Sequence, residues 1–357
     1  MLSLRLPLHP VKITTLALLA SLVAVPASWG QGDDEVRPDV TDLDRMAVRQ
    51  AVNVHRHVLP TNLNNGKGEH RSKLPGARVL AARAQAAAAS SRGLRYPGDL
   101  FYLGGPVVDS AQSHAIYMLP NGTCPISTCW GNPEGFLRAL GQSEFVHVVD
   151  QYVGLFGSQR YGVGTHASLK FTPRTTPFTD ADMQAVVHAV AKALGKTGYG
   201  HIYHVFLPQG TDECFDSTFS ECYSPDNFNT FYYCAYHSSV DFTDIGHVLY
   251  SVEPYQNAVG CNVRPGTPNG PLVDSTNNVL SHETFETITD PDGNAWWNLL
   301  DNGLYGEEIG DECAFLAIVG NSLLFDPSLF RAEGKVFAAQ PEYDNSAHAC
   351  STGPGGD

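Results

Sequence analysis

The residues best suited to chemistry lie in one short stretch, His282-Glu283-Thr284-Phe285-Glu286. In a helix, His282 and Glu286 stand four residues apart on one face, with Glu283 beside them. An imidazole and a carboxylate at this spacing can bind zinc, while the adjacent carboxylate acts as general base on a water activated by the metal. Because Glu286 replaces the second imidazole of the usual His-Glu-x-x-His pattern, harder ions such as calcium are alternatives to zinc. We therefore predict a metal-site helix with His282 and Glu286 as ligands and Glu283 as the catalytic base.

An acidic, glycine-containing loop follows this helix. Glu308 lies 22 residues after Glu286 and is followed by Gly310, Asp311 and Cys313. Zincins with a glutamate as third ligand place it on a second element at a comparable distance along the chain. We predict Glu308 as the third ligand, with Asp311 either ligating the metal or orienting His282. The alternative is that these carboxylates form a solvated acidic loop.

Two histidines outside this stretch are further candidates. His237 follows Cys234-Ala235-Tyr236, and His247 follows Gly246. An imidazole beside a zinc ion can polarise a substrate carbonyl or stabilise an oxyanion, so we predict a catalytic role for His237 and His247. A structural role is the alternative for each.

The ordered set of motifs resembles the Exordium-like (phosphate-induced protein) family of plants and, more closely, its bacterial relatives. The resemblance covers roughly residues 100 to 350 and rests on these motifs: Ser281-His282-Glu283-x-x-Glu286, Glu308-Ile309-Gly310-Asp311-x-Cys313, Ser224-Pro225-Asp226, Tyr233-Cys234-Ala235-Tyr236-His237, Asp244-Ile245-Gly246-His247 and Gln340-Pro341-Glu342-Tyr343. It implies a secreted protein with a zincin-like metal site, and it does not specify a reaction. Leu103 stands where the plant members have a histidine, so any role of that histidine does not carry over.

The N-terminus has the pattern of a secretory signal. Residues 1–30 combine Arg5 and Lys12 with an apolar run from Ile13 to Val25 and small residues before Gly30. We expect export, a secreted location and no stable membrane insertion after cleavage; an uncleaved anchor is the alternative. The formal charge of −15 disfavours nucleic acid as a partner.

The eight cysteines fit an oxidising compartment, where thiols pair. Their spacing suggests four pairs: Cys124–Cys129, Cys214–Cys222, Cys234–Cys261 and Cys313–Cys350. Eight cysteines permit 105 pairings, so other connectivities stay open. A Cys313–Cys350 bridge would tie the C-terminal tail to the acidic loop and hold Glu308 in place.

The chain divides into three parts by composition. After the signal peptide, residues 31–95 are expected to form a flexible linker or a pro-segment, with a helix over Thr41–Leu59. Residues 96–357 are expected to form one globular, catalytic-like domain. Strands are predicted at His114–Leu119, His201–Leu207, Phe231–Val240 and Val248–Val252, and a helix between Thr179 and Gly195. The predicted fold class is α/β (mixed α+β): a zincin-like mixed sheet backed by helices, with a metal-site helix and disulfide-stabilised loops.

Two functions remain in competition. The first is a secreted zinc endopeptidase that acts on a peptide or cell-wall substrate through Glu283. The second is a non-enzymatic, extracellular or cell-wall-associated binding protein in which the metal is structural. Carbohydrate hydrolysis by a carboxylate pair such as Glu283 and Glu308 is a weaker third, and it would need no metal.

Overall fold

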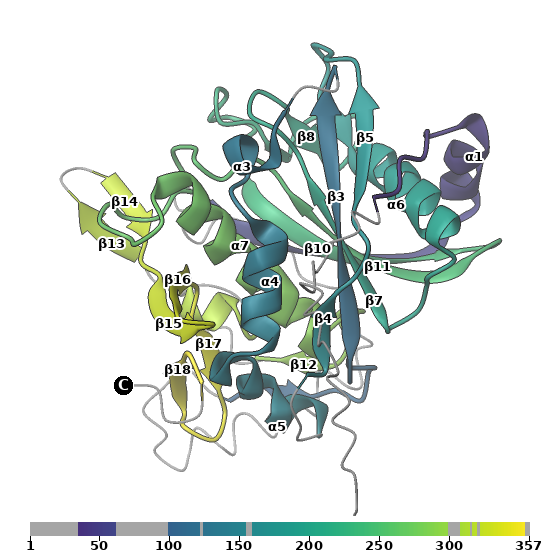
Figure 1. Cartoon of the computed structure of the whole chain (residues 1–357). Coiled ribbons are helices and arrows are strands. Elements are labelled where there is room, and N and C mark those ends of the chain that lie inside the picture. The colour runs from purple at the N-terminus through teal and green to yellow at the C-terminus, as the bar shows by residue number, and fades with distance from the viewer. Residues whose placement is uncertain are drawn as a thin grey trace, which may run out of the picture. The chain divides into compact units, whose positions relative to one another are not determined.

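A seven-stranded mixed sheet organises the fold, with helices on both of its faces (Figure 1). The computed structural model describes residues 35–61, 99–121, 124–154, 159–298, 308–314, 316–319 and 322–353, all within one unit, residues 34–357. The strand order is β1-β10-β11-β7-β3-β4, and β5 also pairs with β3. The strands are β1 (Val52–Pro60), β10 (Tyr233–Phe242), β11 (Gly246–Glu253), β7 (His201–Phe206), β3 (Ala111–Pro120), β4 (Tyr161–Val163) and β5 (Ala167–Phe171). The β1–β10 and β10–β11 pairs are antiparallel, and β11–β7, β7–β3, β3–β4 and β3–β5 are parallel. The α/β (mixed α+β) fold class is thereby confirmed.

Alternating side chains divide the core between the two faces of the sheet. Tyr203 and Val205 of β7 belong to an apolar cluster with helix α6 (Asp180–Leu194). Ile202 and Phe206 of the same strand belong to a second cluster with α4 (Pro133–Gly141) and α7 (Pro271–Thr289). Figure 1 shows α6 with α1 (Asp42–Gln50) on one side of the sheet and α4 with α7 on the other. The sheet therefore has an α6 face and an α7 face.

Short elements complete the described chain. They are β2 (Phe101–Tyr102), α3 (Ile126–Cys129), η1 (Glu144–Val149), α5 (Asp150–Val153), β6 (Phe178–Thr179), β8 (Glu213–Cys214), β9 (Cys222–Tyr223), β12 (Trp296–Trp297), η2 (Asp311–Cys313), β13 (Leu316–Val319), β14 (Ser322–Phe325), β15 (Ser328–Ala332), β16 (Lys335–Ala339), β17 (Glu342–Asp344) and β18 (Ala349–Ser351). Among the described residues, no helix is long and apolar enough to cross a membrane.

The predicted strands and the helix after Thr179 are confirmed within a few residues as β3, β7, β10, β11 and α6. Helix α6 begins with a capping box between Thr179 and Asp182 and ends at Gly195, whose φ of 63° is left-handed. Both signals are those that predict helix boundaries from sequence.

The expectation of a flexible linker does not hold for the part of residues 31–95 that the structure describes, 35–61, whereas the pro-segment stays a prediction. The helix expected over Thr41–Leu59 ends at Gln50, and Val52–Pro60 instead forms β1, which pairs with β10 inside the main sheet. The strand is explained by its regular pairing with β10 from His55 to Leu59, where His57, Val58 and Leu59 are buried. Residues 35–61 are thus part of the folded unit. The signal peptide (1–30) and residues 62–98 lie outside the described residues.

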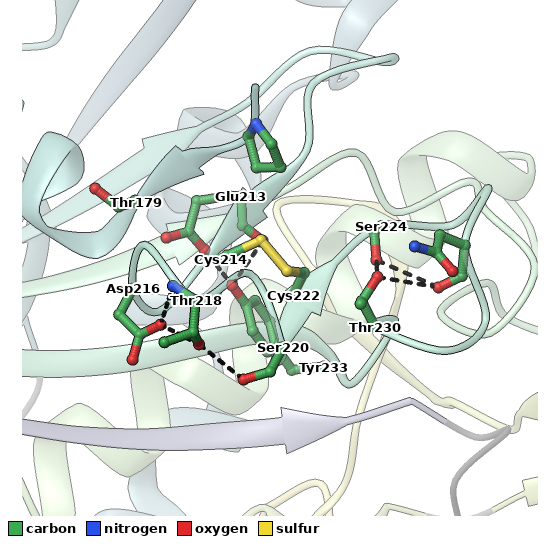
Figure 2. The surroundings of a disulfide bond; sticks show 12 residues. Thr179, Glu213, Cys214, Asp216, Thr218, Ser220, Cys222, Ser224, Thr230 and Tyr233 are labelled. Carbon is green, nitrogen blue, oxygen red and sulfur yellow. Dashed lines mark hydrogen bonds between the residues drawn. A yellow bond between two sulfur atoms is a disulfide. The ribbon is translucent and has the colours of Figure 1, made fainter. Parts of the chain in front are cut away.

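All four expected disulfides are present: Cys124–Cys129, Cys214–Cys222, Cys234–Cys261 and Cys313–Cys350. Figure 2 shows the Cys214–Cys222 bridge, which joins β8 to β9 beside Glu213 and Tyr233. The tyrosine hydroxyl donates to the carboxylate and to the backbone carbonyl of Glu213. Cys313–Cys350 joins η2, in the acidic loop, to β18 near the C-terminus.

Candidate metal centre

The strand register brings two histidines together on the α7 face. His57 of β1 lies directly opposite His237 of β10. Residues paired in this way point to the same face of a sheet. Both side chains are buried, and Trp297 packs its ring edge-on against His57 at 5.3 Å between centroids.

Helix α7 presents its polar residues to these histidines. The helix is buried along nearly its whole length, so each polar group on it needs an internal partner. Thr284, Thr287 and Thr289 satisfy their hydroxyls by donating to the carbonyl four residues earlier. His282, Glu283 and Glu286 are left to meet groups from other elements.

The acidic loop closes against the same turn of α7. The backbone N–H of Asp311 donates to Glu286 Oε1 at 3.2 Å, and that of Glu308 donates to Asp311 Oδ2 at 3.2 Å. A Cβ on Gly310 would lie 2.4 Å from His282 Nδ1, so only glycine allows this approach. The Cys313–Cys350 bridge fixes the loop on its far side.

Three imidazoles and three carboxylates form a closed, alternating ring, which we call the His–carboxylate ring. Going round it, the nitrogen–oxygen distances are His57 Nε2 to Asp311 Oδ2 2.6 Å, Asp311 Oδ1 to His282 Nε2 3.9 Å, His282 Nε2 to Glu286 Oε2 3.1 Å, Glu286 Oε2 to His237 Nε2 3.7 Å, His237 Nε2 to Glu308 Oε2 3.3 Å, and Glu308 Oε1 to His57 Nδ1 3.4 Å. Ligands of one metal ion stand at such separations from one another.

Burial makes the ring electrostatically unusual. His282 and Glu283 are fully buried, and the most exposed member of the ring, His57, is only 7% exposed. Burial lowers the pKa of His282 to about 4 and that of His237 well below its ordinary value. At neutral pH these rings are therefore neutral, the form that binds metals.

The pKa values of the carboxyl groups shift in the opposite direction. Burial, and then the charge of neighbouring carboxylates, raises the pKa of Glu283 and of Glu308 well above the ordinary value. Burial foremost also raises the pKa of Glu286 and of Glu342, which stands near Glu286 and Asp311. Among the described residues, no lysine or arginine pairs with these glutamates. A buried cation would supply the missing positive charge.

Several of these groups make no hydrogen bond. They are both carboxyl oxygens of Glu283, Glu308 and Glu342, and both ring nitrogens of His237. A buried polar atom without a partner costs about 1 to 3 kcal/mol, and more when it is charged. Imidazole nitrogens and carboxylate oxygens are also the atom types that bind zinc, and His237, Glu283 and Glu308 belong to groups whose ligand atoms lie within 4.8 Å of one another.

Gln340, rather than Asp311, orients His282. Its Nε2 lies 2.8 Å from His282 Nδ1 and donates to the carbonyl of Gly310 at 2.6 Å. The ring of His282 is thereby held with Nε2 toward Glu286. Asp311 faces this same Nε2 instead, at 3.9 Å, which places it among the candidate ligands.

The structure brings the predicted His282, Glu283, Glu286, Glu308 and Asp311 together with His237. It does not bring His247 to them. His247 pairs with Asp241 at 2.7 Å and Asp292 at 3.3 Å near the start of β11. His237 is placed as a candidate ligand rather than beside the ring as an oxyanion donor.

Sequence reasoning missed His57, Gln340 and Glu342. His57 lay in the segment interpreted as a linker, although its alternation with Val58 and Val54 is typical of a strand. The Gln340-Pro341-Glu342-Tyr343 motif was noticed, but nothing in its spacing pointed to α7. These contacts span more than 50 residues and become visible only in the folded chain.

No protein-family model, no curated protein and no solved structure matches this chain in the comparisons made.

Proposed function

We propose that this protein is a secreted, metal-dependent hydrolase, with zinc as the first candidate ion and calcium as the alternative. The observation that carries the proposal is Glu283, whose carboxyl oxygens make no hydrogen bond although the residue is fully buried beside His282 and Glu286. A purely structural centre needs ligands, but it does not need an additional adjacent carboxylate without a hydrogen-bonding partner. The four disulfides support export, since disulfides persist in oxidising compartments.

The residues divide into ligands and a base. Zinc accepts neutral imidazoles and carboxylates as ligands. The residues that would supply them are His282, Glu286, His237, Glu308 and Asp311. A bound ion would provide a Lewis acid and lower the pKa of water toward neutrality. Glu283 would accept a proton from that water and return it to the leaving group.

A peptide is the substrate class that the sheet favours. β1 stands at the end of the strand order and carries His57 of the ring. An extended chain that pairs with a terminal strand is held by backbone hydrogen bonds. A peptide aligned along β1 would pass the candidate metal centre.

The test is hydrolysis of a fluorogenic peptide library by the full chain, with Glu283→Gln as the matched variant. We expect turnover by the parent, loss on chelation with recovery on zinc addition, and a variant that keeps its metal but loses turnover at least about a hundredfold. Undiminished hydrolysis by Glu283→Gln would contradict the assigned role. Hydrolysis that persists in chelator would favour metal-free carboxylate chemistry instead.

The second candidate is a non-enzymatic extracellular or cell-wall-associated binding protein with a structural metal site. The specific observation in its favour is the burial of Glu283 and of the entire ring. A closed structural centre holds its ion without an open coordination position. It predicts bound metal and loss of thermal stability on chelation, with no turnover of any peptide by the parent or the variant.

A further inference from the structure

The potential ligand atoms on the α7 face fall into three overlapping sets. Within each set the atoms lie within 4.8 Å of one another: His57 with Asp311, His237 with Glu308, and His282 with Glu283, each completed by Glu286. Glu286 is thus the one residue common to all three. Its Oε2 faces both His282 Nε2, at 3.1 Å, and His237 Nε2, at 3.7 Å, while its Oε1 accepts the backbone N–H of Asp311.

One zinc ion cannot use this many donors. Structural and catalytic zinc is almost always four-coordinate, with bonds of about 2.0 to 2.2 Å to nitrogen and oxygen. The ring offers six side chains, three of them carboxylates with a second oxygen. Donors therefore remain after one ion has been fully coordinated.

The buried charge leads to the same conclusion. Five carboxyl groups in or near the ring are at most 1% exposed: Glu283, Glu286, Glu308, Asp311 and Glu342. Among the described residues, no lysine or arginine pairs with the ring glutamates. A single divalent ion offsets two negative charges, so more than two of these carboxyl groups can ionise only if further positive charge is bound, since uncompensated buried charge costs several kcal/mol per ion. Both oxygens of Glu308 and of Glu342 lack any hydrogen bond that would reduce that cost.

We propose that the ring is a dinuclear centre, in which Glu286 bridges two divalent ions. One ion is bound by His237 and Glu308, and the other by His282 and Asp311. His57 links the two ligand sets, with 2.6 Å to Asp311 and 3.4 Å to Glu308. The inference rests on the proposed metal-dependent function and specifies its ion count.

A dinuclear centre changes the chemistry available to the site. Two ions about 3.5 to 4 Å apart can stabilise the attacking and the leaving oxygen of a substrate at the same time. Substrates with two oxygens at the reacting centre gain most from this arrangement. The ion count therefore determines which hydrolase mechanism the site can support.

The test is the number of ions per chain, measured by elemental analysis of the full chain after loading with zinc and removal of free metal. We expect two ions in the parent and one in His237→Gln, which removes one ligand set and keeps side-chain volume. His188→Gln is the matched control, because His188 of α6 is an equally buried histidine and pairs with Asp44 and Asp244, away from the ring. It should keep two ions.

Glu308→Gln provides the same test if His237→Gln fails to fold, and it should also retain one ion. Electron paramagnetic resonance of the parent protein loaded with manganese is an independent measurement. Two neighbouring ions should give a spin-coupled signal. One ion in the parent and an uncoupled six-line manganese spectrum would overturn the dinuclear inference and leave the hydrolase proposal standing. No ion in the parent would overturn both.

Discussion

The sheet has a buried acidic cluster on each face, and the two clusters handle their charge differently. On the α6 face, Asp180 receives Arg56 Nε at 2.6 Å and the hydroxyl of Tyr250 at 2.6 Å, while Tyr233 and Tyr236 contact Glu213. We call this set the tyrosine cluster. On the α7 face, Glu283, Glu308 and Glu342 make no hydrogen bond through either carboxyl oxygen.

The difference shows which feature indicates a metal site. Burial alone does not indicate a metal site, because Asp180 and Glu213 are as buried as Glu283. The tyrosine cluster carries its own cation and donors, whereas the carboxylates of the His–carboxylate ring face imidazoles and backbone N–H groups, with no lysine or arginine paired to its glutamates among the described residues. Adjacent residues of β1 serve the two clusters, Arg56 on one face and His57 on the other. This contrast supports the proposal that an external cation binds on the α7 face.

The largest expected effect is that of removing the cation. A chelator should lower the free energy of unfolding by about 4 kcal/mol or more, since ligand held at a thousandfold its dissociation constant stabilises by that amount. Urea denaturation of the full chain with and without chelator measures the loss. Equal unfolding midpoints in the two conditions would mean that the α7 face needs no cation.

Removing one disulfide near each face of the sheet should show that only the α7 face depends on its bridge for metal binding. Replacing Cys313 and Cys350 by serine should cost about 3 to 4 kcal/mol and also weaken metal binding, because the bridge holds the loop of Glu308. The matched control replaces Cys214 and Cys222, beside the tyrosine cluster (Figure 2). That control should lose stability but keep its metal content. Equal metal loss in both would argue against a specific role of Cys313–Cys350.

Arg56→Met tests the internal cation of the tyrosine cluster. Its removal leaves the carboxylate of Asp180 buried without its guanidinium partner, and we expect a loss of about 2 to 3 kcal/mol, reduced because Arg56 is about one-third exposed. The loss should be the same with zinc and with chelator, measured by thermal unfolding. A loss that depends on zinc would couple the two faces and contradict their independence.

Gly310→Ala should weaken metal binding more than it weakens the fold. The new Cβ would lie 2.4 Å from His282 Nδ1 and displace that ring from its ligand position. We expect about a tenfold loss of affinity or more, as for changes that misorient a ligand. Gly162→Ala, where a Cβ meets no atom within 4 Å, is the control for competition titration with a zinc indicator.

The smallest effect is a pH dependence of the metal-free protein. Burial raises the pKa of Glu253 to about 7, while a glutamate in an unfolded chain titrates near about 4.3. The folded state therefore holds the Glu253 proton more tightly in this window, and the contribution of Glu253 to stability should fall as pH rises from about 4.3 through about 7. Glu253→Gln should flatten part of that slope in urea titrations with chelator. A slope that is the same in the parent and in Glu253→Gln would contradict the raised pKa of Glu253.

The helix of the candidate site and helix α6 could be predicted because their signals lie within a few consecutive residues. The spacing of His282, Glu283 and Glu286 is a property of one helical turn, and the capping residues of α6 mark its ends. The cysteine spacing likewise predicted the four bridges.

The rest of the site depends on register and on long-range packing. The position of His57 follows from its pairing with His237, 180 residues away in the chain, and no local pattern encodes that pairing. Residues 52–59 were predicted as the end of a helix, because Val54 and Val58 have the four-residue spacing of a helix face as well as the alternation of a strand. Gln340 reaches His282 only once the C-terminal strands have folded against α7.

The most direct test of the account is metal content in two matched variants, one from each acidic cluster. Glu286→Gln removes the carboxylate shared by all three ligand sets, and Glu213→Gln removes a buried carboxylate from the tyrosine cluster. After equilibration with zinc and removal of free metal, the account predicts bound zinc in the parent and in Glu213→Gln, and none in Glu286→Gln. Zinc absent from the parent, or retained in full by Glu286→Gln, would contradict the claim that the α7 face holds a cation.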